Sequence, residues 1–166
     1  MQILIPDSWL REFVKTTATP KEIQEALSLC SASVDRLHKV GNDYVYDIEI
    51  TTNRVDLMSV VGLALEAAAI LPAKLLTNPL ETKTSINLSK TVDYLKVKVD
   101  PKLCLRFTAI LIQGVFVKPS PARLVKRLEL VGMRGLNNVV DVSNYLMHEL
   151  GQPVHTFDYD KITKHT

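Results

Sequence analysis

Three short segments near the start of the chain have the hydrophobic pattern of β-strands. Residues 2–5 form an apolar run that ends at a proline. Residues 34–40 and 44–50 follow, and the Gly-Asn-Asp sequence between them is typical of a turn. In the last segment the residues alternate between two faces, as they do in a strand with one buried side. The pattern therefore predicts a small antiparallel sheet that contains a hairpin.

Helical spacing of apolar residues predicts three helices in the same part of the chain. Asp7 or Ser8 is expected to cap the first helix. The second helix begins at Pro20 with a Thr-Pro-Lys-Glu sequence, which has the order of a capping box. Its apolar face includes Cys30, so this thiol is predicted to lie in the core. The third helix, at residues 57–71, is apolar on nearly all sides but falls short of the ~20 apolar residues that span a membrane.

The second half of the chain predicts both strands and helices. Strands are expected at residues 92–99 and 107–117, and the second is apolar enough to be buried on both faces. A hydroxyl followed by proline at Ser120 marks the start of a helix. Another helix is predicted at residues 139–150, with Gly151 as its C-terminal cap.

Together these elements predict an α+β fold. Residues 1–75 are expected to form a small domain in which helices pack on an antiparallel sheet. Residues 76–91 are rich in short polar side chains and lack periodicity, which indicates a linker. Residues 92–166 are expected to form part of a mixed sheet-and-helix domain.

Composition narrows the function classes. The chain is 46% hydrophobic and 23% charged, as in ordinary globular domains, and its net charge is only +2. Any contacts with nucleic-acid phosphates must therefore be local, since a general basic field is absent. The two cysteines have neither zinc-site nor disulfide-framework spacing, and no targeting segment is evident, so a cytoplasmic protein is expected.

The most informative stretch for chemistry is a helix followed by a Gly-Gln-Pro turn that presents His155. Asp141, Ser143 and Asn144 interleave with apolar residues on this helix, and such polar groups either cap a neighbouring segment or line a pocket. One interpretation is that Asp141 and Asn144 satisfy backbone groups of the preceding turn and that His155 is a hydrogen-bonded loop residue. The spacing of the histidines does not favour a metal site.

Several motifs in order resemble one family. Residues 140–158 read VDVSNYLMHELGQPVHTFD, close to the pattern VDVTNYVxLELGQPxHAFD of the beta subunit of bacterial phenylalanyl-tRNA synthetase. Residues 47–62, DIEITTNRVDLMSVVG, resemble its DIEITPNRPDxLSxxG. Residues 104–107 and the Gly-Met-Arg at 132–134 resemble two further motifs. The resemblance covers nearly the whole chain, and the order of separate motifs makes it specific.

The resemblance implies a role in a larger enzyme. The family enzyme is an alpha2-beta2 heterotetramer that uses ATP and magnesium to join phenylalanine to its tRNA, with the synthetic site on the alpha subunit. The implied partners of this chain are therefore the alpha subunit and the tRNA for phenylalanine, without DNA or a membrane. No cofactor is expected to be bound by this chain. The implied contribution is scaffold and part of an editing site that hydrolyses wrongly attached tyrosine.

The resemblance also implies which residues line that editing site. His155 and Asn144 match positions near the ester, Ser143 stands where the family has a threonine, and Arg134 matches a position near the tRNA end or the pocket rim. No catalytic residue for synthesis and no nucleophilic side chain is expected. Positioned water and tRNA hydroxyls would attack the ester, with His155 orienting water or relaying a proton.

The chain departs from the family pattern in three ways. A tRNA-binding domain is usually inserted where this chain has only residues 37–43, and Val55 stands at a position that is usually proline. The acidic residue that reads the tyrosine hydroxyl in the family has no counterpart here, so the isolated chain is expected to have little or no editing activity. Two alternatives stay open: a free-standing trans-editing hydrolase and a non-catalytic module that docks on tRNA or the alpha subunit.

Overall fold

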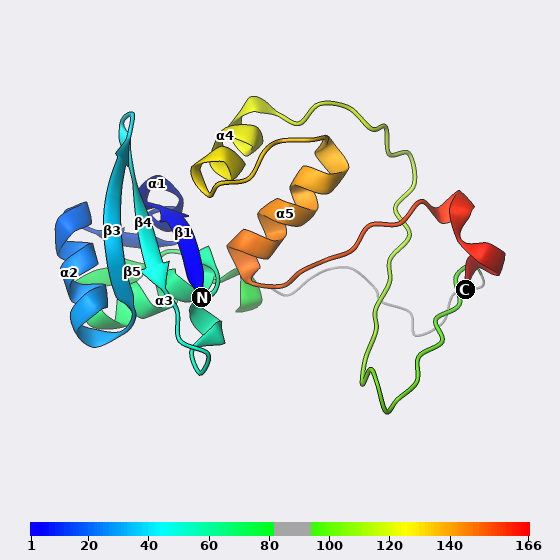
Figure 1. Ribbon diagram of the computed structural model, residues 1–166, viewed down its shortest axis with the longest axis horizontal. Coiled ribbons are helices and arrows are strands. Elements are labelled where there is room, and N and C mark those ends of the chain that lie inside the picture. The colour runs from blue at the N-terminus through cyan, green and yellow to red at the C-terminus, as the bar shows by residue number, and fades with distance from the viewer. Residues whose placement is uncertain (82–93) are drawn as a thin grey trace.

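The computed structural model describes residues 1–81 and 94–166 and has helices packed on two small antiparallel sheets, which confirms the α+β class (Figure 1). The larger sheet has the strand order β1-β4-β3, and the smaller pairs β2 with β5. The strands are β1 (Gln2–Pro6), β2 (Val14–Thr16), β3 (Ser33–Val40), β4 (Asp43–Glu49) and β5 (Ala73–Leu75). The α-helices are α1 (Asp7–Leu10), α2 (Pro20–Cys30), α3 (Val60–Ile70), α4 (Ala122–Leu130) and α5 (Asn138–Leu150). Short 3-10 helices occur at Val55–Leu57, Pro79–Glu81, Tyr159–Lys161 and Thr163–His165.

The predicted hairpin is confirmed. Strands β3 and β4 pair antiparallel around a turn in which Gly41 has a φ of +59°, a left-handed conformation that favours glycine. Strand β1 pairs with the other edge of β4, so that Ile5 lies opposite Tyr46. Both residues are fully buried, and α1, α2 and α3 complete the core around them.

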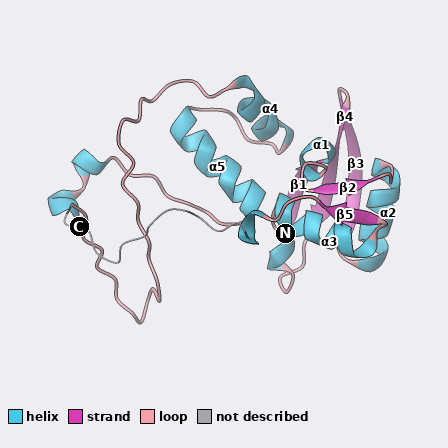
Figure 2. Ribbon diagram, turned by 180° about the vertical axis from the view of Figure 1, so that it is seen from behind, coloured by secondary structure: helices cyan, strands magenta, loops and turns pink. Residues whose placement is uncertain are grey.

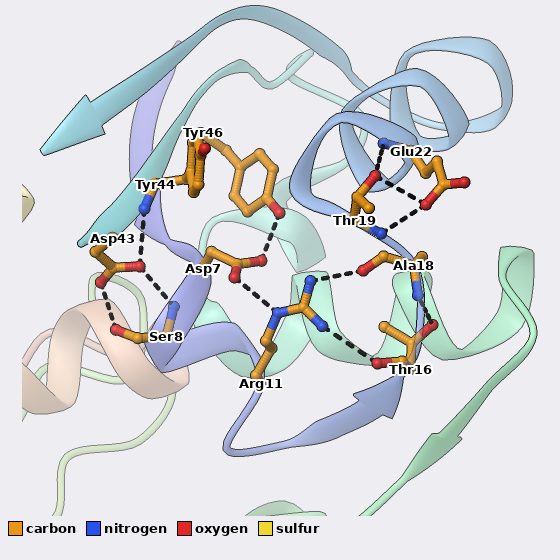
Figure 3. A network of polar contacts seen from close by, with 10 residues as sticks. All are labelled: Asp7, Ser8, Arg11, Thr16, Ala18, Thr19, Glu22, Asp43, Tyr44 and Tyr46. Atoms are coloured by element: carbon orange, nitrogen blue, oxygen red, sulfur yellow. Dashed lines mark hydrogen bonds and ion pairs between the residues drawn. The ribbon is translucent and has the colours of Figure 1, made fainter.

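The first helix differs from its prediction. Helix α1 is a single turn, and neither Asp7 nor Ser8 caps it, because both side chains have long-range partners (Figure 3). The Asp7 carboxylate accepts hydrogen bonds from the Tyr46 hydroxyl at 2.6 Å and from Arg11 Nε at 2.7 Å. The Ser8 hydroxyl donates to Asp43 at 2.5 Å. These contacts tie α1 to the sheet.

Helix α2 begins as predicted but ends differently. The capping box is present, since Thr19 Oγ1 accepts from the Glu22 amide and the Glu22 carboxylate accepts from the Thr19 amide (Figure 3). Ile23 and Leu27 are fully buried. The prediction of a core thiol at Cys30 is wrong, because the last turn of α2 is uncovered and Cys30 is exposed.

The helix predicted at residues 57–71 is divided. A 3-10 turn comes first, and α3 begins only after Ser59, whose hydroxyl accepts a hydrogen bond from the Gly62 amide at 2.9 Å. The two pieces pack so closely that a Cβ on Gly62 would lie 1.9 Å from the carbonyl oxygen of Asp56. A competing serine cap and this backbone contact explain why the helix starts late.

The strand predicted at 107–117 is absent, and so is the part of the strand predicted at 92–99 that the structure describes. Residues 96–121 contain neither helix nor strand, while residues 92 and 93, like most of the predicted 76–91 linker, lie outside the described residues. The apolar side chains of this arm, defined as residues 103–117, are largely exposed. A strand needs a neighbour for its backbone hydrogen bonds, and the described residues place none beside the arm.

Helices α4 and α5 pack against the first part of the chain, beside β1 (Figure 2). Leu128 and Val131 belong to the same hydrophobic core as Trp9 and Leu10. The predicted glycine cap of α5 is confirmed, with a φ of +75° at Gly151, and Gly132, just after α4, also has a positive φ of +78°. No helix within residues 1–81 and 94–166 has both the length and the apolar character to cross a bilayer.

Candidate functional site

The predicted site residues lie on or next to α5. Ser143 and Asn144 occupy the middle of the helix and are partly buried, and the Ser143 hydroxyl donates to the Val140 carbonyl at 2.7 Å. His155 lies beyond the helix and is exposed, with its ring 6.5 Å from that of Phe157. Arg134 is exposed on the connection from α4 to α5.

The structure brings only two of these four together. Ser143 and Asn144 are neighbours on α5, but no hydrogen bond, ion pair or ring contact among the described residues joins either of them to His155 or Arg134. Nor does the His155 imidazole have a hydrogen-bond partner in the described part of the chain. The interpretation of His155 as a hydrogen-bonded loop residue is therefore wrong, since it is an exposed residue without such a bond in the described part of the chain.

Asp141 fulfils the structural interpretation. Its side chain is 1% exposed, and one carboxylate oxygen accepts from the Leu136 amide at 2.9 Å. The other accepts from the Ser120 hydroxyl at 2.5 Å. Ser120 was expected to cap α4, but Pro121 holds the N-cap position instead and the serine is used to fix α5. Buried Asp141 thus locks the connection between the two helices.

Asn137 and Asn138 fix the start of α5 in different ways. Asn137 is the N-cap, and its side chain accepts from the amides of Val139 and Val140 at 3.0 and 3.1 Å. Asn138 reaches the end of the arm and the residue that follows it. Its side-chain nitrogen donates to the Phe116 carbonyl at 3.0 Å, and its oxygen accepts from the Lys118 amide at 2.9 Å. Sequence reasoning missed this second role, for which the Asn-Asn pair is the only local signal.

A second group of residues escaped sequence reasoning. Arg127 of α4 is 9% exposed, and its guanidinium lies 5.1 Å from the centre of the Trp9 ring. It donates to the Tyr145 hydroxyl at 2.5 Å and forms an ion pair with Glu12. We call this group, together with Glu149, the Arg127 cluster. The signal for it is an arginine within the apolar stripe of α4, between Leu124 and Val131 in helical spacing.

Burial changes the acid–base properties of this region. Burial, followed by hydrogen bonding to Glu149 and the charge of Glu149, raises the pKa of Tyr145 to about 12. Burial lowers the pKa of His148 below its ordinary value of 6.5. The phenol is therefore un-ionised and His148 neutral at physiological pH, which limits the proton chemistry available on this face of α5.

Two surface grooves lie against α5, but none of the four predicted site residues lines either of them. One, of about 350 Å³, is lined by residues of α3 and by Leu150 and Gly151. The other, of about 500 Å³, lies between β1 and α5 and is lined by His148 and Met147 among others. In the ranges that the structure describes, no group of three or more His, Cys, Asp or Glu side chains could hold a metal ion.

Comparison with known proteins connects this region to one domain family. Residues 103–166 match the model of the B3/4 domain. This stretch contains the arm, α4, α5 and all four predicted site residues.

Relatives match over most of the chain. The phenylalanine–tRNA ligase beta subunit of Geobacter sulfurreducens is 45% identical over 128 residues, which cover 75% of this chain and 15% of the relative. That of Rhodopirellula baltica is 39% identical over 161 residues, or 96% of this chain and 23% of the relative. That of Moorella thermoacetica is 44% identical over 139 residues, or 81% and 17%. The chain spans less than a quarter of the length of these relatives.

Proposed function

Because the chain belongs to the family of phenylalanine–tRNA ligase beta subunits, we propose that it acts as a portion of such a subunit. In this proposal it joins an alpha subunit in an alpha2-beta2 complex that charges the tRNA for phenylalanine in the cytoplasm. The complex uses ATP and magnesium, and this chain binds neither. The observation that carries the proposal is identity of about two residues in five along 96% of the chain.

We further propose that the chain supplies part of an editing site that removes wrongly attached tyrosine. A synthetic pocket shaped for the phenylalanine ring rejects an analogue with one added hydroxyl only by roughly 100-fold. A second site that binds the hydroxyl supplies the missing discrimination. The B3/4 match to residues 103–166 supports this assignment, since it includes the helix and turn that carry the candidate residues.

The candidate residues have roles that fit their exposure. His155 is exposed and has no hydrogen-bond partner among the described residues, so its imidazole is free to orient a water or relay a proton at the ester. Asn144 offers an amide that no described protein group occupies. Ser143 already donates to a carbonyl at 2.7 Å, which leaves its oxygen as an acceptor. Arg134 is exposed and suited to a phosphate of the tRNA end.

The decisive experiment places this sequence in the complex. The matching segment of the Moorella thermoacetica beta subunit is replaced by this chain and co-expressed with the alpha subunit. We expect assembly, charging of the tRNA with phenylalanine, and hydrolysis of tyrosyl-tRNA. His155→Ala should lower hydrolysis by about 100-fold or more and leave charging unchanged. His38→Ala, an exposed histidine on β3, is the control and should alter neither rate.

The alternatives are separated by the same reagents. Failure to assemble with the alpha subunit, or full hydrolysis by the His155→Ala complex, contradicts the proposal. We expect the isolated chain to hydrolyse little or no tyrosyl-tRNA. Hydrolysis by the isolated chain that is lost on His155→Ala would instead indicate a free-standing trans-editing hydrolase. If the chain assembles with the alpha subunit but His155→Ala has no effect on hydrolysis, the remaining alternative is a non-catalytic docking module.

A further inference from the structure

Arg127 is a buried cation held between two parts of the chain that are distant in sequence. Its guanidinium lies 5.1 Å from the centre of the Trp9 ring and 5.9 Å from that of Tyr145. The two rings stack with centroids 4.5 Å apart and an interplanar angle of 28°. Glu12 supplies the counter-charge. Arginine suits this place because its planar group can stack on rings and form an ion pair at once.

Helix α5 is held along a single face. Asp141, Tyr145 and Glu149 are spaced four residues apart, so their side chains lie above one another on the helix. Each has a partner outside the helix. Asp141 accepts from Ser120, Tyr145 accepts from Arg127, and Glu149 accepts from Trp9 Nε1 at 3.0 Å.

Two of these three partnerships connect the N-terminal part of the chain to α5, one directly and one through Arg127. Trp9 of α1 donates to Glu149 in the last turn of α5. Glu12, two residues after α1 ends, forms an ion pair with Arg127, which in turn donates to Tyr145. Successive residues of a helix are turned by about 100° from one another. Fixing the Tyr145 ring therefore fixes the direction in which the preceding residue, Asn144, projects.

We propose that Trp9, Glu12 and Arg127 are positioning residues, which set the rotation of α5 and thereby aim Asn144 and Ser143 at the substrate of the editing site. The inference rests on the proposed function. An apolar pair would also hold two helices together, but it would allow them to slide and rotate. A buried guanidinium that forms an ion pair and directed hydrogen bonds specifies one arrangement, which is the use of buried polar groups that is best attested.

Arg123 provides a matched control. It donates to the same oxygen of Glu12 as Arg127 does, at 2.7 Å, but its side chain is 75% exposed and it contacts neither ring. Both arginines lie on α4, four residues apart. Replacement of either arginine by methionine removes one positive charge near Glu12. Only the replacement of Arg127 also removes the hydrogen bond to Tyr145 on α5.

The experiment uses the assembled complex described above. Arg127→Met should lower kcat for hydrolysis of tyrosyl-tRNA about tenfold, since small displacements of positioning groups have effects of that order or larger. It should also change the ratio of tyrosyl-tRNA to phenylalanyl-tRNA hydrolysis, while charging stays unchanged. Arg123→Met should stay within about twofold of the unsubstituted complex, and Arg127→Lys should recover part of the loss.

The ratio of tyrosyl-tRNA to phenylalanyl-tRNA hydrolysis distinguishes a loss of positioning from a loss of stability. A smaller folded fraction lowers both hydrolysis rates by one factor and leaves their ratio unchanged, whereas a turned helix alters it. An unchanged ratio or rate in Arg127→Met overturns the inference, and where that variant fails to assemble, an unchanged ratio in Arg127→Lys does the same. Two further variants show which idea a negative result overturns. If Asn144→Ala and His155→Ala keep full hydrolysis as well, the proposed function itself fails. If these two variants lose hydrolysis while Arg127→Met does not, only the inference about positioning fails.

Discussion

At the residue scale, the single side chain of Asp141 holds the connection between α4 and α5 in place through two hydrogen bonds. It is 1% exposed and accepts from the Leu136 amide and the Ser120 hydroxyl. Asp141→Ala removes the acceptor of the partly buried Leu136 amide and of the Ser120 hydroxyl and leaves a gap at a buried position, so we expect the free energy of unfolding to fall by ~2–3 kcal/mol. Ser120→Ala removes one donor and should cost about 1 kcal/mol. Urea denaturation followed by fluorescence of the single tryptophan, Trp9, measures both changes.

Asp100 supplies the control for this prediction. It also accepts a backbone amide hydrogen bond, from Lys102 at 2.9 Å, but it is exposed. Asp100→Ala should therefore change the free energy of unfolding by less than about 0.5 kcal/mol. Equal losses for Asp100→Ala and Asp141→Ala would contradict the role assigned to burial.

His148 predicts a pH dependence of stability. Burial lowers its pKa below 6.5, so the unfolded chain binds a proton more readily than the folded one. Stability contributed by the neutral imidazole is complete above pH 6.5 and is lost as the pH falls from 6.5 toward the lower pKa of the folded state. Substitution by a side chain that does not titrate, His148→Gln, should flatten the stability profile in this window.

The measurement is chemical denaturation at a series of pH values between 5 and 8. His165→Gln, which changes an exposed histidine outside the packing of α4 and α5, is the control. A profile whose slope below pH 6.5 is the same with and without His148 would contradict the prediction.

At the residue scale, local signals predicted caps only where no distant partner competed. Thr19 and Glu22 form the expected capping box because both belong to one turn. Asp7 and Ser8 have equally good capping side chains, but the fold brings Tyr46 and Asp43 to them. Such contacts depend on the register of the sheet and cannot be predicted from neighbouring residues.

At the element scale, two of the glycines that have a positive φ at the end of an element, Gly41 and Gly151, differ in what surrounds them. Gly41, in the hairpin turn, has nothing within 4 Å of the position that a Cβ would take, with a φ of +59°. At Gly151, the end of α5, a Cβ would lie 3.2 Å from Cβ of Ser59, which caps α3. The end of one helix therefore presses on the start of another.

This difference gives a paired prediction. Gly41→Ala should cost about 1 kcal/mol, the penalty of the left-handed conformation alone. Gly151→Ala should cost about 1 kcal/mol more, because Ser59 must also move and its bond to the Gly62 amide weakens. Equilibrium denaturation of the two variants tests this, and equal losses would show that the contact with Ser59 has no energetic weight.

Elements defined by local spacing were predicted, whereas those that depend on neighbours were not. Helices α2 and α5 and the β3-β4 hairpin follow from caps, apolar periodicity and a turn sequence. The apolar run at residues 107–117 has the composition of a buried strand, but composition does not supply the second strand that would pair with it. The Arg127 cluster was missed for a similar reason, because the aromatic partners of Arg127 lie on two other helices, Trp9 on α1 and Tyr145 on α5.

At the scale of the whole molecule, one core joins parts of the chain that the sequence pattern separates. Leu128 and Val131 of the α4 region belong to the same hydrophobic cluster as Trp9 and Leu10. The Arg127 cluster lies at this junction. The arm, by contrast, leaves the core and exposes its apolar side chains, so the molecule combines a well-packed body with an unpaired apolar segment (Figure 1).

The exposed arm predicts self-association. Ile110 and Ile112 are 66% and 73% exposed on a segment whose backbone groups lack strand partners, and exposed edges of this kind pair with other chains. We expect the purified chain to bind the dye ANS and to form dimers or larger species whose fraction rises with concentration. The double variant Ile110→Lys, Ile112→Lys should reduce both effects. Leu29→Lys changes an isolated apolar residue that is 84% exposed on α2, and it should alter neither. A monodisperse monomer without ANS binding, measured by light scattering over a wide concentration range, would show that the arm is protected in solution.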